Sequence, residues 1–220
     1  MTSVYIAPEI AEMMALHPYL RDPAFLTMPV REQVMQQAAT LWAAHRAGDR
    51  RVRVQIMSWW PAAAGQALDA VMAAPFGEAD ARATLSREYG YPGWAAVEAL
   101  GDAAPDRRFE QTVETMLEGA LAELAARLAE APDLAWQRSE FGHRATLLHY
   151  LGANGVETHR QRVPLNAVEI ARTLIAAGAS KTAEAGMYGG GQTPLSLART
   201  SAHPHKAGLA KDLTRILSVD

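Results

Sequence analysis

The feature that most constrains the fold is the short interval at which Pro and Gly interrupt an otherwise helix-forming sequence. The chain is rich in Ala and has few runs of alternating β-branched residues, so local propensity favours helix over strand. Breaks fall at Pro61, 75–77, 91–93, 101–105 and 132–133. Short helices with one apolar face cannot bury that face alone, so the sequence predicts helices that stack as repeats.

Apolar residues recur at helical spacing between these breaks. The stripes are Val34, Ala38, Leu41, Trp42 and His45; Met116, Leu117, Leu121, Leu124 and Leu128; and Ala167, Ile170, Ala171, Leu174 and Ile175. The order Asn-Ala-Val-Glu at 166–169 predicts a capping box and a helix that starts there. Pro194 suits a first helical position. We expect Leu124, Leu128, Leu174, Ile175, Ile216 and Leu217 to share one core.

Three segments are similar to one another and to the ankyrin repeat. One runs from Thr-Leu-Leu-His at 146–149 through Gly155 to Gly178 and Ala179, and one from Thr-Pro-Leu-Ser at 193–196 to Leu217. A more degenerate copy covers 109–132. In the ankyrin family a Thr-Pro-Leu-His turn opens the first helix, and the second ends in paired aliphatic residues. The Ser at 196 departs from that pattern.

Longer strings resemble a bacterial group of ankyrin-type proteins that have a helical N-terminal region. They are Ala-Ala-His-Arg-Ala-Gly-Asp at 43–49, Arg-Glu-Tyr-Gly-Tyr-Pro-Gly-Trp at 87–94, residues 143–150 and 154–157, and Tyr-Gly-Gly-Gly at 188–191. The resemblance implies an all-α, ankyrin-like solenoid with degenerate repeats and a divergent helical cap. The expected parts are an N-terminal extension (1–30), a helical cap region (31–105) and a repeat region (106–220).

The composition of the chain argues against two classes of partner, nucleic acid and membrane. The net charge of −3 comes from 21 basic and 24 acidic residues scattered along the chain, which gives no basic patch for nucleic acid or anionic lipid. No stretch approaches the roughly 18 apolar residues of a membrane span, and the first residues do not resemble a signal peptide. The absence of Cys removes disulfides and thiolate chemistry. We therefore expect a cytoplasmic protein that binds neither nucleic acid nor membrane.

Extra residues interrupt the repeats at three places: an insert at 156–166, an extension with Tyr188 and three glycines, and a third at 203–205. Extensions at like positions of stacked repeats gather on one edge, and loops on rigid scaffolds often carry function. We therefore expect exposed loops that form the functional site. Its predicted residues are Tyr150, Asn154, Glu157, His159, Arg160, Arg162, Tyr188 and His203.

Some of these features have structural explanations. His149 is expected to hydrogen-bond the backbone around Thr146, as in ankyrin turns. The glycines at 189–191 suit a tight turn and lack the spacing of a phosphate-binding loop. Five of the seven His follow residue 140, but no acidic partner stands at helical ligand spacing. We therefore predict neither a metal nor a cofactor.

Two function classes remain open. The first is a binding module that presents its polar loops to a protein partner, the usual role of such repeats. The second is a small-molecule binder or enzyme, in which His, Arg, Asn and Tyr side chains close a pocket for hydrolysis, isomerisation or cyclisation by acid–base catalysis. The sequence has no Gly-x-Ser-x-Gly elbow and no recognisable pair of carboxylates. We therefore favour binding over catalysis.

Overall fold

The computed structural model describes residues 3–219, most of which are helical. Its contacts divide the chain into two compact units. The N-terminal unit comprises residues 8–105, and the C-terminal unit joins residues 3–7 to residues 106–219. Residues 3–7 thus belong to the C-terminal unit and residues 8–30 to the N-terminal unit. None of the helices in the described part of the chain is long and apolar enough to span a bilayer.

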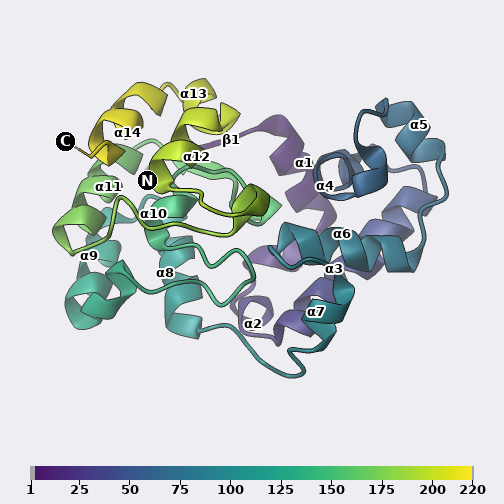
Figure 1. Ribbon diagram of the computed structural model, residues 1–220, viewed down its shortest axis with the longest axis horizontal. Helices are drawn as coiled ribbons and strands as arrows, with labels where there is room; N and C mark the ends of the chain where they lie inside the picture. The colour runs from purple at the N-terminus through teal and green to yellow at the C-terminus, as the bar shows by residue number, and fades with distance from the viewer. Residues whose placement is uncertain (1–2, 220) are drawn as a thin grey trace. The chain divides into compact units, whose positions relative to one another are not determined.

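The N-terminal unit is built from short helices around a long one. They are α1 (Pro8–Leu16), α2 (Pro23–Leu26), α3 (Val30–Arg46), α4 (Arg53–Trp59), α5 (Leu68–Ala73), α6 (Glu78–Glu88) and α7 (Trp94–Glu98) (Figure 1). The apolar stripe of α3, including Val34 and Leu41, is buried, and α3 packs along α6. His17, Gln55 and Glu88 form a buried hydrogen-bonded chain, with bonds of 2.9 and 2.8 Å.

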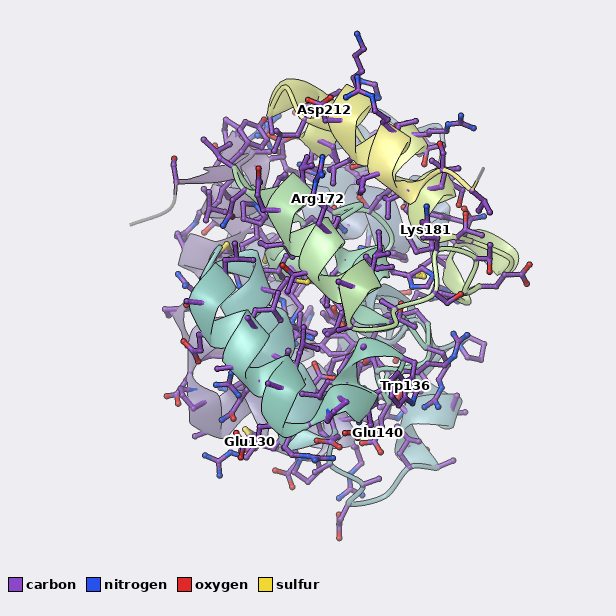
Figure 2. All side chains as sticks on the ribbon, turned by 90° about the vertical axis from the view of Figure 1, so that its left-hand side faces the viewer. Glu130, Trp136, Glu140, Arg172, Lys181 and Asp212 are labelled. Atoms are coloured by element: carbon purple, nitrogen blue, oxygen red, sulfur yellow. The ribbon has the colours of Figure 1, made fainter. Side chains whose placement is uncertain are left out.

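The C-terminal unit follows with a succession of helices. They are α8 (Arg107–Leu117), α9 (Leu121–Glu130), α10 (Leu147–Tyr150), α11 (Ala167–Ala176), α12 (Pro194–Thr200), α13 (Ala202–Lys206) and α14 (Ala210–Leu217). Contacts join α8 to α9, α9 to α11 and α11 to α14. Helices α9, α11 and α14 lie side by side on one face, where Arg172 and Asp212 are exposed (Figure 2).

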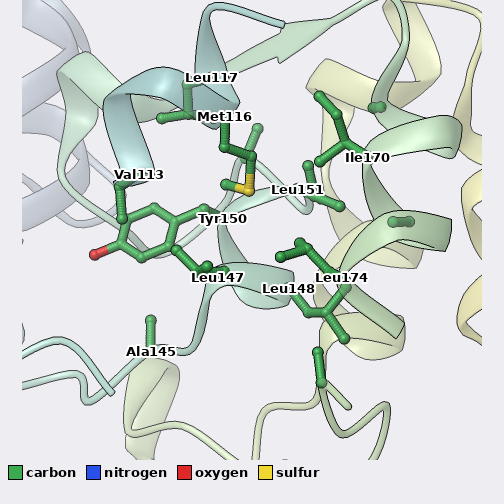
Figure 3. Close-up of a cluster of buried hydrophobic side chains, with 14 of the residues drawn as sticks. Val113, Met116, Leu117, Ala145, Leu147, Leu148, Tyr150, Leu151, Ile170 and Leu174 are labelled. Atoms are coloured by element: carbon green, nitrogen blue, oxygen red, sulfur yellow. The ribbon is translucent and has the colours of Figure 1, made fainter. Parts of the chain in front are cut away.

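One apolar core runs through this unit, as the helical stripes predict. Leu124, Leu128, Leu174 and Leu217 belong to it, and Ile175 and Ile216 pack against it partly buried. The ring of Tyr150 lies beside Val113 and Leu147 in the same cluster (Figure 3). The expected sharing of one core by these six residues is confirmed.

A short antiparallel sheet supplements the helices. Strand β1 (Val4–Ile6) pairs with β2 (Arg162–Pro164), and Tyr5 lies opposite Val163. The Val-Tyr-Ile sequence of β1 has the β-branched and aromatic character that strands favour. This pairing fastens the middle of the 156–166 insert to the start of the chain.

The predicted turns form with one correction. Thr146 N–H donates to His149 Nδ1 at 3.1 Å, so the structural role expected for this His is confirmed. In the second turn, Thr193 and Ser196 make a reciprocal capping box, which shows how Ser replaces the usual His. Helix α11 starts after Asn166 as predicted, but the predicted capping box is wrong. The Asn166 side chain donates instead to the Gly119 carbonyl at 2.9 Å.

Candidate functional site

The insert at 156–166 is buried, which corrects the expectation of an exposed polar loop. It contains a turn of 3₁₀ helix (Thr158–Arg160) followed by β2. Glu157 is 0%, Arg160 1% and Arg162 2% exposed. Charged side chains are buried to this degree only where they pair with groups of opposite charge.

Those partners come from α8. Glu110 and Glu114 lie one helical turn apart, so both carboxylates project from the same side of the helix. Arg160 donates through Nη1 to Glu110 Oε2 at 2.5 Å and through Nε to Glu114 Oε1 at 2.9 Å. Arg162 donates through Nη2 to the other oxygen of Glu114. The insert is therefore attached to α8 by a fork of charge-assisted hydrogen bonds.

A second pair extends this cluster. His143 Nδ1 accepts the N–H of Ala145 at 3.1 Å, which places the ring proton on Nε2. Nε2 then donates to Glu157 Oε1 at 3.0 Å. The other oxygen of Glu157 lies 3.7 Å from Arg160 Nη1. The guanidinium carbon of Arg160 also lies 5.7 Å from the ring centre of Tyr150.

The charges nearly balance. Three carboxylates, Glu110, Glu114 and Glu157, face the two guanidinium groups of Arg160 and Arg162. Burial works to raise the pKa of Glu114, but Arg160 and Arg162 outweigh it and hold that pKa at about 2. For Glu110, burial dominates and raises the pKa. Glu110 is thus the carboxylate that takes up a proton most readily.

His159 stands apart within this cluster. It is 2% exposed, and neither ring nitrogen has a hydrogen-bond partner among the described residues. Burial, with the positive charge of Arg160, lowers its pKa to about 3, so the ring is neutral. A neutral, unpartnered imidazole costs stability and does not help to attach the insert to α8.

The remaining predicted residues form a different, more exposed group. Tyr188 is 62% exposed, and its hydroxyl donates to Asn154 Oδ1 at 2.5 Å. Asn154 Nδ2 in turn donates to Thr200 Oγ1 at 3.3 Å. His203 is the second residue of α13, and its backbone N–H donates to Ser201 Oγ. The eight predicted residues therefore divide between a buried cluster, the Tyr188–Asn154 pair and α13.

Tyr188 projects from a hairpin. A bridge between Ala185 and Gln192 closes this hairpin (185–192), which we call the second hairpin. The first hairpin (139–145) comes earlier in the chain and is shorter. It is closed by a hydrogen bond from Ser139 N–H to Ala145 O, at 2.7 Å. Gly186 N–H donates to His143 O at 2.7 Å, which joins the two hairpins. This hydrogen bond places the two hairpins next to each other.

The structure also holds a groove between α11 and α14. Its volume is about 380 Å³, and it is lined by Leu165, Val168, Glu169, Arg172, Leu209, Asp212, Arg215 and Ile216. Leu165 is 47% exposed. Its lining thus combines four apolar side chains with four charged ones.

Three members of the buried cluster, Glu110, Glu114 and His143, were not among the residues predicted for the site. The two acidic residues stand four apart on α8, next to the buried Phe109 and Val113. That spacing was the available sign, because a carboxylate on a buried helix face requires a partner. Within residues 3–219, no group of three or more His, Asp or Glu side chains is arranged to hold a metal ion. Comparison with protein-family models, curated proteins and solved structures finds no match to this chain.

Proposed function

We propose that this chain is an ankyrin-type helical-repeat protein that binds a protein partner through its second hairpin. Helix pairs joined by short links, such as α8 and α9 across residues 118–120, support the repeat assignment. The two similar turns at 146–149 and 193–196 also support it, as does the hydrogen bond that joins the two hairpins. In this proposal the buried insert (156–166) is a structural brace, meaning that it stabilises the fold without contacting the partner. The exposed second hairpin is the contact surface.

The observation that carries this proposal is the way Tyr188 is presented. Its backbone has a φ of 53°, a left-handed conformation that costs a bulky residue energy, and three glycines with positive φ follow it. The ring packs over Gly155, where an added Cβ would lie 3.0 Å from Tyr188 Cε2. Its hydroxyl is held by Asn154. An aromatic ring that is fixed yet exposed loses little entropy on binding, which is the property of an interface anchor.

Affinity capture tests the proposal. The biotinylated full chain is incubated with cell extract, and captured proteins are compared between the wild type, Tyr188→Ala and Leu165→Ala. Leu165 is the matched control because it is also an exposed apolar side chain but lines the groove between α11 and α14. We expect a specific partner to be lost with Tyr188→Ala and retained with Leu165→Ala. Retention by Tyr188→Ala would overturn the assignment, and loss with Leu165→Ala alone would place binding in the groove.

A small-molecule or enzymatic role is the alternative, and one observation favours it. Neither ring nitrogen of His159 has a hydrogen-bond partner among the described residues, so both could engage a substrate. A pKa of about 3 nevertheless makes this ring a weak base at neutral pH. However, its neighbours Glu157, Arg160 and Arg162 are all 2% exposed or less. A substrate would have to displace the insert to reach them. The exposed hairpin is therefore the better supported contact surface.

A further inference from the structure

A second pocket in the C-terminal unit is distinguished by its charge. It measures about 280 Å³ and is lined by Arg199, His205, Ala210, Lys211 and Thr214. The basic side chains come from three separate helices, α12, α13 and α14, and none of the lining residues is acidic. His205 belongs to the third sequence extension, which the proposed binding surface does not use. Small-molecule sites usually measure about 300–1,000 Å³. Because this pocket lies just below that range, it suits only a small ligand.

The cations of this pocket lack partners within the protein. No hydrogen bond or ion pair engages the side chains of Arg199 or Lys211 among residues 3–219. By contrast, Arg215, one turn along α14 from Lys211, is paired with Asp212 at 2.8 Å. Two unpaired cations that face one pocket create a local positive potential, which favours an anion there.

The position of Lys211 adds to this potential. It lies in the first turn of α14, where the helix dipole disfavours a cation. The residue before the helix, Leu209, offers no side-chain cap to the first N–H groups. The acidic residue of that turn, Asp212, lines the groove on the other flank of α14 instead. Lys211 thus stands at an unfavourable helix position, and the neighbouring Asp212 is paired with Arg215 instead.

We propose that this pocket binds a small tetrahedral oxyanion, a phosphate or phosphoryl group, between Arg199 and Lys211. The planar guanidinium of Arg199 matches two phosphate oxygens, and the ammonium group of Lys211 supplies a point charge. Thr214 offers a hydroxyl donor, and His205 lines the same pocket. This site is separate from the Tyr188 hairpin, so the two proposals fail or succeed independently.

A titration with inorganic phosphate tests the site. The ¹⁵N-labelled full chain is followed by NMR at fixed pH and ionic strength, with chloride as the competing salt. We expect phosphate to cause saturable shifts at the backbone amides of residues 210–214. Arg199→Gln combined with Lys211→Gln should weaken binding about tenfold or more, because each charged hydrogen bond is lost.

The matched control is Arg144→Gln combined with Arg172→Gln. It removes the same two positive charges from exposed positions that do not line the pocket. The control should bind phosphate as the wild type does. The proposal is overturned if wild-type shifts do not saturate, if chloride causes the same shifts, or if both double variants respond alike.

Discussion

Replacing Arg160 by Met would remove the cation that joins the insert to α8. The substitution keeps an unbranched, apolar side chain but removes the donors to Glu110 at 2.5 Å and to Glu114 at 2.9 Å. Glu110 is then left 1% exposed without its guanidinium partner, and Glu157 loses the charge 3.7 Å from its second oxygen. Breaking a buried ion pair on one side costs about 3–5 kcal/mol, because the remaining charge is uncompensated.

Urea unfolding provides the measurement. With an m-value of about 2 kcal/mol/M, that loss lowers the urea midpoint by roughly 1.5–2.5 M. Hydrogen exchange of the peptide that covers residues 156–166 should rise in parallel, because this segment is what Arg160 fastens. Adding Glu110→Gln should restore part of the loss, because it removes the carboxylate that Arg160→Met leaves unpaired.

Arg172→Met is the matched control, since Arg172 is exposed on α11 and its substitution should change stability by no more than about 0.5 kcal/mol. A loss below about 1 kcal/mol for Arg160→Met, with no change in exchange of the insert, would refute the brace. The reasoning would also be refuted if Glu110→Gln made the Arg160→Met variant less stable.

Two further predictions concern pH and packing. Burial lowers the pKa of His159 to about 3 and that of His149 to about 4. Below pH 6.5 these two residues therefore bind protons in the unfolded chain but not in the folded chain. The free energy of unfolding should be constant above pH 7 and fall by about 2 kcal/mol for each of the two histidines by pH 5. Urea midpoints at pH 7 and 5 measure this, and an equal fall in His159→Gln would contradict it for His159. Gly152→Ala should destabilise by about 1–3 kcal/mol, because the new Cβ would lie 2.6 Å from Leu197 Cβ. Gly93→Ala, whose Cβ would meet nothing within 4 Å, is the control, and equal thermal midpoints for the two variants would show that α10 and α12 adjust without cost.

The helical core could be predicted from the sequence because its pattern is local. Leu124 and Leu174 each stand in a predicted apolar stripe of helical period, and each is buried in the shared core. Pro194 begins α12 for an equally local reason, since its missing N–H is not needed at the first helical position. Such features depend only on neighbours along the chain.

The buried insert could not be predicted in the same way. Its charged residues suggested exposure, whereas Arg160 pairs with Glu110, fifty residues earlier in the sequence. The pairing of β1 with β2 joins segments that lie even further apart. A charged residue is buried or exposed according to whether a partner meets it in space, and one sequence does not supply that information. The capping box at Asn166 failed for a related reason, because a distant carbonyl on Gly119 takes its side chain.

The burial of Arg160 and Arg162 changes what a loss of binding means at these positions. A variant of either would reduce partner capture simply by unfolding the insert, so capture alone cannot separate a brace from a contact. The separation comes from conditions in which the weakened variant is still folded. If Arg160→Met captures the partner normally at low temperature while Tyr188→Ala does not, the cluster acts through stability and the hairpin through contact. If Arg160→Met loses the partner while its amides remain protected from exchange, the buried cluster itself takes part in recognition, and the division proposed between brace and surface is wrong.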